Sequence, residues 1–571
     1  MSDGGKDNVV DLGALRAQVE ARTREEAEQL QGDTPGDPAE GGDGPDDPRF
    51  VLSCLANNER GDGVLYATLH RGRYLHNKAT GTWLKWNAHH WAPDRMNEAT
   101  AAVDQVALRY QTHAARVSQE IRELEEQKAD FEEEAKACAR REDHDGEAAA
   151  KAKAGAVGNL AQRAAARRKE LNKRVDRLRA VRGAGNCLTW AHCIEDPLAI
   201  VGDEIDRKPL LLPCANGVID LETGELRPGD PADLLVRAIP IEYRGIDQVN
   251  ADWERFIDEI HQGDAEMVAF VRRLLGYTLT GLTTEHFIAC FIGEGANGKG
   301  TLFEVLREVM GELSWAIEPE MLLDQKNAKT SGSASADIIA LHGRRLVVAS
   351  ETDQNRRISA AKVKRLTGGD TLNGRSPHDK YEINFQPSHK LVLYTNHPPK
   401  GLAADFALFR RLVYLWYPLR FVADVAAHQE RDPQNAHLYR PRDVALKARL
   451  LADPAGILAW LVKGCLEWQQ FGGLQPPKAI LAAAEAVRRD EDHLERFLEA
   501  QATRVSAERT IRFAWLYEQF GKWYAESVDE DKRYIPTKKS LADQLRRKGY
   551  KTEVVGGNLK VYGLEVHEVT G

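Results

Sequence analysis

A glycine-rich stretch at residues 293–301 has the residue types that bind phosphate groups. It reads Gly-Glu-Gly-Ala-Asn-Gly-Lys-Gly-Thr and fits the pattern G-x-x-x-x-G-K. Glycines let backbone N–H groups close around phosphate oxygens, and a helix that begins there adds favourable partial charge. Lys299 can reach the β- and γ-phosphates of a nucleoside triphosphate. We therefore predict an ATP site rather than a chance glycine-rich turn, formed by Gly293, Gly295, Asn297, Gly298, Lys299, Gly300 and Thr301.

The position after the lysine departs from the usual pattern. Gly300 stands where a Ser or Thr commonly binds Mg²⁺, so Thr301 is the nearest hydroxyl for that metal. Further along the chain, the apolar residues 346–349 and Ser350 predict a strand that is followed directly by Glu351. A carboxylate at a strand end can orient the water that attacks the γ-phosphate, or accept its proton. Glu351 is therefore the predicted general base and a second candidate ligand for Mg²⁺.

Two further polar positions complete the expected hydrolytic site. Residues 390–395, Lys-Leu-Val-Leu-Tyr-Thr, predict a buried strand and are followed by Asn396. Asn396 would hydrogen-bond the attacking water or the γ-phosphate; an ordinary turn residue is the alternative. Arg410 and Arg411 precede an apolar run at residues 412–415. An arginine that reaches a neighbouring subunit's γ-phosphate stabilises charge in the transition state, whereas the alternative is a pair of surface cations. The predicted catalytic residues are Lys299, Glu351, Asn396, Arg410 and Arg411.

The elements around the glycine-rich stretch position these residues. Residues 287–292 form an apolar run that predicts a buried strand, and apolar residues recur at helical spacing from Leu302 to Val309. Between the two later strands, residues 376–381 read Ser-Pro-His-Asp-Lys-Tyr, which predicts a hairpin with a basic, polar tip. The predicted fold class is therefore α/β, with a nucleotide-binding core.

The rest of the chain divides into segments of different composition. Residues 97–183 are nearly continuous helix formers with an interruption near residues 143–146, which predicts an antiparallel helical hairpin or short coiled coil. Aromatic residues before it predict short strands joined by turns. The predicted organisation is a disordered acidic tail (1–48), a small aromatic-rich domain (49–96), the helical hairpin (97–183), a mixed domain (184–283), the ATPase (284–424), a helical region (425–504) and a C-terminal domain (505–571).

The C-terminal segment is strongly basic. Residues 532–560 hold nine basic and two acidic residues. Two predicted helices and a hairpin at residues 552–564 describe a winged-helix-like module, whose second helix would face a DNA groove. Winged helices also bind proteins, which is the alternative. The predicted DNA-binding residues of this module are Lys538, Lys539, Arg546, Arg547 and Lys548.

Composition narrows the class of protein. Residues 1–48 hold 13 acidic and 4 basic residues, which accounts for the whole net charge of −9 in this chain of 571 residues. No apolar run reaches membrane-spanning length, and the N-terminus does not have the pattern of a signal peptide. The seven cysteines are scattered, without a C-x-x-C pair. We therefore expect a cytoplasmic protein with reduced thiols and no membrane partner.

The order and spacing of these motifs resemble superfamily 3 helicases, and more closely the phage/plasmid primase-helicase family of satellite phages and large DNA viruses. The resemblance implies an AAA+-like core, a ring that is commonly hexameric, ATP at subunit interfaces and a hairpin that grips single-stranded DNA. It makes His378 and Lys380 the hairpin-tip residues that contact DNA, and Arg410 or Arg411 the arginine that acts in trans. The matching segments are residues 293–301, 350–352, 364–370 with Arg375, 395–399 and 405–411.

The expected function is an ATP-driven DNA helicase for replication of a phage, prophage or plasmid, moving 3′ to 5′ by resemblance. Its partners would be single-stranded and duplex DNA, further copies of the chain and replication proteins. The sequence before residue 186 has no zinc-ligand cluster and no convincing carboxylate group for primer synthesis, so no primase site is predicted. Two alternatives stay open: an ATPase of the same fold used in anti-phage defence, and an origin-binding or loading protein without processive unwinding.

Overall fold

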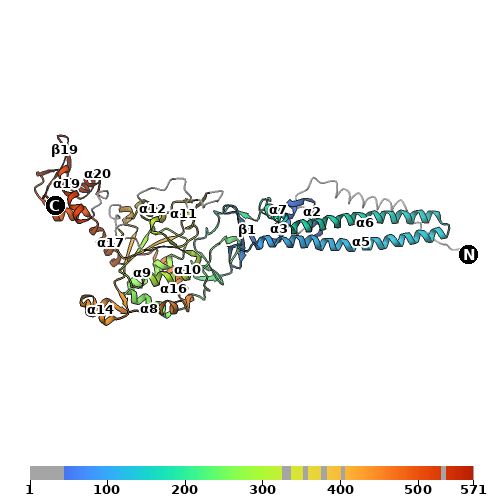
Figure 1. The fold of residues 1–571 in the computed structure, drawn as a ribbon, viewed down its shortest axis with the longest axis horizontal. Coiled ribbons are helices and arrows are strands. Elements are labelled where there is room, and N and C mark those ends of the chain that lie inside the picture. Colours follow the sequence, from blue (N-terminus) through green and yellow to red (C-terminus); the bar gives the residue numbers. More distant parts are fainter. Residues whose placement is uncertain are drawn as a thin grey trace. The chain divides into compact units, whose positions relative to one another are not determined.

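The computed structural model describes residues 44–323, 336–350, 358–374, 382–399, 406–528 and 535–569. These residues form two compact units (Figure 1). Unit 1 comprises residues 44–87 and 91–204, and unit 2 comprises residues 88–90 and 205–569. Each unit has a hydrophobic core of its own.

Unit 1 begins with two helices that the sequence did not predict. They precede a four-stranded sheet of order β3-β2-β1-β4, whose first three strands coincide with the aromatic segments. Gly61 and Gly63 lower the helix propensity of α3. A Cβ on Gly61 would overlap the carbonyl of Cys54, and one on Gly63 would overlap Trp190, so both glycines permit close packing against α2 and α7. The elements are α2 (Pro48–Ala56), α3 (Asn58–His70), β1 (Tyr74–Asn77), β2 (Thr82–Asn87), β3 (His90–Pro93), α4 (Glu98–Ala101), α7 (Val181–Ala191) and β4 (Ala199–Ile200).

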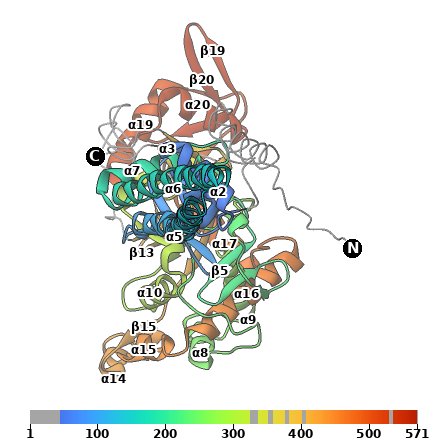
Figure 2. The same cartoon turned by 90° about the vertical axis from the view of Figure 1, so that its right-hand side faces the viewer.

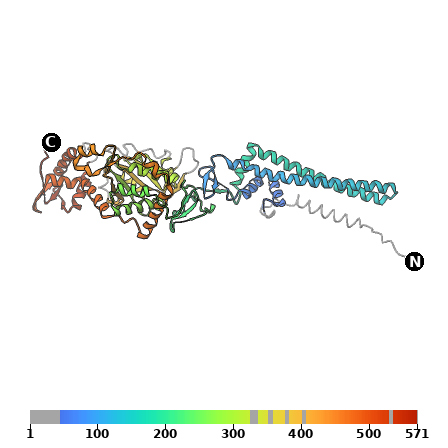
Figure 3. The same cartoon turned by 90° about the horizontal axis from the view of Figure 1, so that it is seen from below.

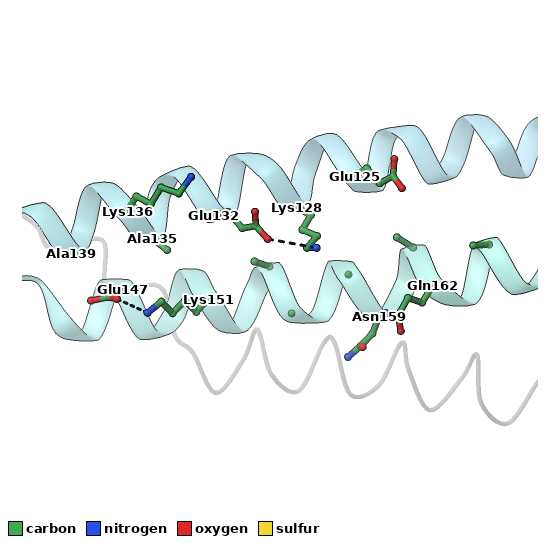
Figure 4. A pocket seen from close by; sticks show the side chains of 15 residues that line it. Glu125, Lys128, Glu132, Ala135, Lys136, Ala139, Glu147, Lys151, Asn159 and Gln162 are labelled. Atoms are coloured by element: carbon green, nitrogen blue, oxygen red, sulfur yellow. Dashed lines mark hydrogen bonds and ion pairs between the residues drawn. The ribbon is translucent and has the colours of Figure 1, made fainter.

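Two long helices, α5 (Val103–Arg140) and α6 (His144–Arg179), lie side by side as an antiparallel hairpin (Figure 3). Their turn falls where the interruption in the sequence predicted it, and the side chain of Asp143 caps α6 by accepting from the N–H of Gly146 at 3.0 Å. Toward the turn, small residues such as Ala154 and Gly158 leave a groove of about 770 Å³ between the helices (Figure 4).

The base of the hairpin shares one hydrophobic core with α2, α3 and α7. Within it, Arg174 of α6 donates to Asp62 of α3 at 2.8 Å, and the hydroxyl of Tyr110 on α5 donates to the other oxygen of that carboxylate at 3.0 Å. Burial nevertheless raises the pKa of Asp62 above its ordinary value. The hairpin and the small region are therefore one domain rather than two. That domain extends past the predicted boundary at residue 183, because β4 pairs with β1.

A five-stranded parallel sheet lies at the centre of unit 2, and the protein is a mixed α/β fold. The strand order is β14-β8-β13-β10-β9, and each neighbouring pair is parallel. Most strand residues are buried and apolar, as is typical of a parallel sheet covered on both faces. These elements are β8 (Ile288–Ile292), α10 (Lys299–Met310), β9 (Ser314–Ile317), α11 (Ala336–Ile339), β10 (Leu346–Ser350), α12 (Ala360–Thr367), β11 (Leu372–Gly374), β12 (Ile383–Phe385), β13 (Lys390–Thr395), α13 (Phe406–Phe409) and β14 (Leu412–Trp416).

Segments before and after the sheet pack into the same core. Helices α9 and α16 approach so closely that only glycine fits at two positions. A Cβ on Gly276 would lie 2.2 Å from the backbone nitrogen of Cys465, and one on Gly464 would lie 2.1 Å from the carbonyl oxygen of Arg272. Side chains of both helices belong to the core of the sheet. The elements are β5 (Leu211–Cys214), β6 (Gly217–Asp220), β7 (Glu225–Arg227), α8 (Ala251–Ile260), α9 (Ala265–Tyr277), β15 (Arg420–Val422), α14 (Val425–Arg431), β16 (Tyr439–Pro441), α15 (Leu446–Leu450), α16 (Pro454–Phe471) and α17 (Lys478–Asp490).

The C-terminal region has a separate core that begins earlier than predicted. Leu494, Phe497 and Leu498 of α18 belong to that core, and β17 pairs with β21, so the region starts after α17 rather than at residue 505. The two predicted helices and the hairpin are present. The elements are α18 (His493–Gln501), β17 (Ala502–Arg504), β18 (Thr510–Arg512), α19 (Phe513–Ser527), α20 (Lys538–Arg547), β19 (Thr552–Val555), β20 (Asn558–Tyr562) and β21 (Leu564–Val566).

Candidate nucleotide site

The glycine loop, residues 293–298, connects β8 to α10. Gly298 has a φ of +90°, and a Cβ there would lie 2.8 Å from the Cγ2 of Ile260. A Cβ on Gly293 would lie 2.3 Å from the carbonyl oxygen of Tyr417. By contrast, a Cβ on Gly295 or Gly300 would meet only open space. The loop is therefore packed tightly on one side and open on the other, which leaves room for a phosphate group at the amino end of α10.

Lys299 and Asn297 set the shape of this loop. Both side chains are buried, and the ammonium group of Lys299 donates to the carbonyl oxygen of Gly293. Asn297 donates to the carbonyl oxygen of Glu294 at 2.9 Å and accepts from the backbone N–H of Lys299 at 3.4 Å. The lysine charge thus lies within the loop, while Asn297 holds the backbone that surrounds it.

The carboxyl ends of the parallel strands bring further predicted residues to the same edge of the sheet. Thr395, the last residue of β13, is in register with Ile292, and Asn396 follows it, so Asn396 and the glycine loop lie at one edge. Ser350 ends β10 beside Tyr394. Glu351 comes next in the sequence and lies outside the described residues.

Arg410 and Arg411 lie at the opposite edge. The backbone N–H of Ile288, at the start of β8, donates to the carbonyl oxygen of Arg411 at 2.7 Å. The five residues of β8 separate that point from the glycine loop, a distance of about 17 Å at the usual rise of a strand. Arg411 donates to Lys364 O and Thr367 Oγ1 of α12 at 3.3 and 3.4 Å, whereas Arg410 is exposed. Neither arginine is therefore placed to reach a nucleotide in its own subunit.

Two residues that the sequence did not indicate, His261 and Tyr417, contact the glycine loop through hydrogen bonds. His261 Nδ1 lies 2.7 Å from the carbonyl oxygen of Ile257, and Nε2 lies 3.0 Å from the hydroxyl of Tyr417. Burial lowers the pKa of His261, so its ring is neutral near pH 7. A neutral ring that donates a hydrogen bond from Nδ1 accepts one at Nε2, here from the hydroxyl of Tyr417. The carbonyl of Tyr417 in turn accepts from Asn297 at 3.4 Å, which links this pair to the glycine loop.

The segment that follows β14 also makes direct contacts with the glycine loop. The backbone N–H of Phe421 donates to the carbonyl oxygen of Ala296 at 2.7 Å. Arg420 forms an ion pair with Glu294. Because the partners lie more than 120 residues apart in the chain, no local sequence signal indicates these contacts.

The residues present suit magnesium bound together with a triphosphate. Thr301 is half-buried in the first turn of α10 and directly follows Gly300. Across the parts of the chain that the structure describes, no group of three or more His, Cys, Asp or Glu side chains could hold a metal ion. Mg²⁺ usually needs only one or two protein oxygens when substrate phosphates and water supply the others. Thr301 and Glu351 remain the candidate protein ligands.

The predicted DNA-contacting residues fall into two places. Strands β11 and β12 form the paired stem of a hairpin, with Gly374 opposite Ile383. His378 and Lys380 belong to the connection between these strands, outside the described residues.

The second place is the C-terminal region, where the predicted cations differ in their partners. Lys539 and Arg547 are exposed on α20. Lys538 is exposed too, with its ammonium group 5.5 Å from the centre of the Tyr517 ring, and Arg546 forms an ion pair with Asp543 at 2.6 Å. Lys548 differs from these, because it pairs with two carboxylates. The carboxylates are those of Asp492 and Glu495, each 2.6 Å from the ammonium group. Burial disfavours the charged form of Lys548, but the hydrogen bonds to these carboxylates raise its pKa.

Two family profiles match the chain. One is described as D5 N terminal like and matches residues 64–262, and one is described as a family of unknown function (DUF5906) and matches residues 291–411. The "Putative helicase L207/L206" of Acanthamoeba polyphaga mimivirus is 27% identical over 61% of this chain and 38% of its own length. The "Primase D5" of Fowlpox virus (strain NVSL) is 25% identical over 38% of this chain and 28% of its own length.

The chain is therefore similar to helicases and primases of large DNA viruses, and these matches support a phage and viral primase-helicase family. It spans well under half the length of these two relatives in the family. Among solved structures, the A form apo structure of the NrS-1 C-terminal region aligns with 57% of this chain and 77% of its own, at 13% identity and a TM-score of 0.32. Within the described part of the chain, no helix has both the length and the apolar character needed to cross a bilayer.

Proposed function

We propose that this chain is a primase-helicase family protein, an ATP-dependent DNA helicase with a superfamily 3, AAA+-like core. The observation that carries the proposal is the placement of three predicted groups on one parallel sheet. The glycine loop and Asn396 lie at its carboxyl edge, and Arg410 lies at its amino edge. This division suits an ATP site that is completed by a neighbouring subunit.

The loop binds the triphosphate through its backbone N–H groups and the amino end of α10. Lys299 exchanges its bond to the carbonyl of Gly293 for bonds to the β- and γ-phosphates. Thr301 and Glu351 hold Mg²⁺, which neutralises charge on the phosphate oxygens when it is bound.

Hydrolysis requires a positioned water and a proton acceptor. Asn396 orients the water from the end of β13, and Glu351 accepts its proton as the water oxygen bonds to the γ-phosphorus. The bond between that phosphorus and the β–γ bridging oxygen breaks, which releases ADP. The strands that these two residues follow in the sequence, β13 and β10, are parallel neighbours in the sheet.

Ring assembly supplies the remaining charge. Arg410 is exposed at the far edge of the sheet and therefore meets the γ-phosphate of the next subunit when copies associate head to tail. Arg411 donates to the carboxyl end of α12 in its own subunit. It therefore has a structural role and does not contact the neighbour's nucleotide.

The hairpin of β11 and β12 and the C-terminal region contact DNA in this proposal. The hairpin tip with His378 and Lys380 grips single-stranded DNA in the ring. The exposed cations of α20 bind the phosphates of duplex DNA in a winged-helix-like manner.

A strand-separation assay tests the proposal. Purified full-length chain is mixed with a forked DNA duplex, ATP and Mg²⁺, and the released strand is measured together with phosphate production. Unwinding that requires ATP and is lost in Lys299→Ala protein is the expected result. DNA-stimulated hydrolysis without strand release would instead favour a loading protein and contradict the helicase.

A further inference from the structure

The hairpin of β19 and β20 ends in an apolar tip. Val554 and Val555 are 68% and 40% exposed, and Gly556 and Gly557 follow them. These four consecutive residues offer no side-chain hydrogen-bond donor or acceptor. The hairpin projects from the body of the C-terminal region (Figure 2). These four residues can therefore make only apolar and backbone contacts, and the nearest polar side chain across the turn, Asn558, donates to the carbonyl oxygen of Gly556 at 3.3 Å.

The conformation of the tip is defined by its turn. Gly556 and Gly557 both have positive φ, at +59° and +76°, as in the tight two-residue turns that match strand twist. Val555 and Asn558 form the closing pair of the ladder. At the base of the hairpin, Val561 is fully buried in the C-terminal core. The exposed valines therefore sit at the end of an anchored element.

Cations flank the hairpin. Arg512 of β18 and Glu553 of β19 are both in register with Lys560 of β20, and Glu553 also pairs with Lys551 at 3.0 Å, so three cations surround one carboxylate. Arg546 of α20 donates to the hydroxyl of Thr552 at 2.7 Å, so the basic helix is fastened to the start of the hairpin. Arg547 is exposed on the same helix. This arrangement favours a polyanionic partner around an apolar point.

We propose that Val554 and Val555 form a wedge that inserts between neighbouring base pairs of duplex DNA and unstacks them. Apolar side chains inserted at a base step unstack it, while cations on either side hold the phosphate backbone. The valines have no group that could read base edges or bind phosphate, so apolar contact with base faces is the interaction that their chemistry allows. The proposal rests on the proposed function only in taking DNA as the ligand, because unstacking needs no ATP.

The test uses the full chain without nucleotide and a duplex that carries 2-aminopurine, whose fluorescence rises when it is unstacked. We expect saturating protein to raise the fluorescence at the contacted step. The variant V554T/V555T keeps the β-branched shape and strand propensity but replaces a methyl with a hydroxyl on each residue. It should lose the rise, while affinity falls by less than about tenfold because phosphate contacts dominate binding. The variant V554I/V555I, which keeps both side chains apolar, should give the same rise in fluorescence as the native chain.

Lys560→Gln is the matched control. It should weaken binding and reduce the salt slope by roughly one unit, yet give the full rise at saturation. An unchanged rise in V554T/V555T, or duplex binding by the native chain without any rise, overturns the wedge. A tip that docks a protein instead would give the second result, duplex binding without any rise. Lys299→Ala protein should give the native rise, so failure of the helicase and failure of the wedge can be told apart.

Discussion

Lys299 lies buried at the first position of α10, and its ammonium group already bonds within the glycine loop. In the proposed ATP site, a nucleotide would therefore meet a positive charge that is already buried in the folded chain. Asn297 donates to the carbonyl oxygen of Glu294 and so stabilises the loop without any contribution from a ligand. At this scale the site is organised in advance, which makes single substitutions informative.

Lys299→Ala should abolish ATP hydrolysis, because it removes the charge that faces the β- and γ-phosphates. Glu351→Gln should retain nucleotide binding and lose turnover, since an amide cannot accept the water proton. Phosphate release and equilibrium binding of a fluorescent ATP analogue measure the two effects. Lys447→Ala is the matched control, because Lys447 pairs with Glu304 on the outside of the same helix at 2.9 Å. Normal turnover in Lys299→Ala would show that the nucleotide binds elsewhere.

His261→Ala should raise the KM for ATP and lower the melting temperature, because it leaves the buried hydroxyl of Tyr417 without its acceptor. Such a loss costs about 1–3 kcal/mol. Tyr417→Phe removes the same bond without the unpaired hydroxyl and should cost less. Equal effects of both substitutions, measured by thermal unfolding and steady-state kinetics, would argue against this origin.

The same histidine predicts a pH dependence. Its pKa is lowered in the folded protein from an ordinary value of 6.5, so the unfolded chain binds its proton first as pH falls. The stability that its neutral form contributes is complete above pH 6.5 and is lost as pH falls from there through the folded pKa. The difference in melting temperature between the native protein and His261→Ala should therefore shrink between pH 7 and pH 5.

The sequence indicated the residues whose spacing follows a motif and missed those that meet only through the fold. Gly298 and Lys299 are recognisable because one short loop must contain both. His261 and Tyr417 are 156 residues apart, and neither stands in a recognisable pattern. Their contact depends on α8 packing beneath the loop, which local periodicity cannot specify.

At the scale of elements, the direction of β14 determines what its flanking residues can do. A parallel strand brings its carboxyl end to the glycine loop and keeps its amino end at the other edge, so Arg410, which precedes β14, lies at the edge opposite the loop. The glycines of α3 show the limit of element prediction. Gly61 and Gly63 argue against a helix in isolation, but α2 and α7 pack so closely there that larger residues would clash.

Arg410→Ala should reduce turnover by about 10³-fold, the scale of arginines that act in trans. Mixing it with Lys299→Ala protein should recover activity, because some interfaces then hold one intact half from each variant. Arg411→Ala should instead lower stability, since its bonds are to α12 of its own subunit. Hydrolysis measured against protein concentration checks the assembly requirement. A dilute monomer with full activity would contradict it.

The hairpin of β11 and β12 is the proposed translocating element. The double variant H378A/K380A should keep basal ATPase and duplex binding but stop unwinding, because the stem remains paired while the tip no longer grips the strand. Strand release and phosphate production are measured on the same samples. Unwinding at the native rate would assign translocation to another element.

At the scale of the whole molecule, the domain boundaries were the least predictable feature. Composition changes near residue 505, yet the C-terminal core reaches back to Leu494, and strand pairing between β17 and β21 closes it. Likewise, α9 precedes the strands of the sheet in the sequence and α16 follows them, yet both helices join its core and contact each other closely at glycines. Such boundaries are set by long-range packing, which a single sequence specifies only weakly.

Removal of residues 491–571 should weaken binding to duplex DNA and leave basal ATPase largely intact, because the cut falls between α17 and a region with its own core. The exposed cations of α20 are lost with it, so the slope of log affinity against log salt should fall by roughly one unit for each phosphate contact removed. Fluorescence anisotropy across salt concentrations and phosphate release measure both effects. Removal of residues 505–571 is the instructive comparison, because it leaves Leu494, Phe497 and Leu498 of α18 without their packing partners and should reduce solubility. If the shorter deletion is well behaved and the longer one loses ATPase, the structural boundary after α17 is wrong.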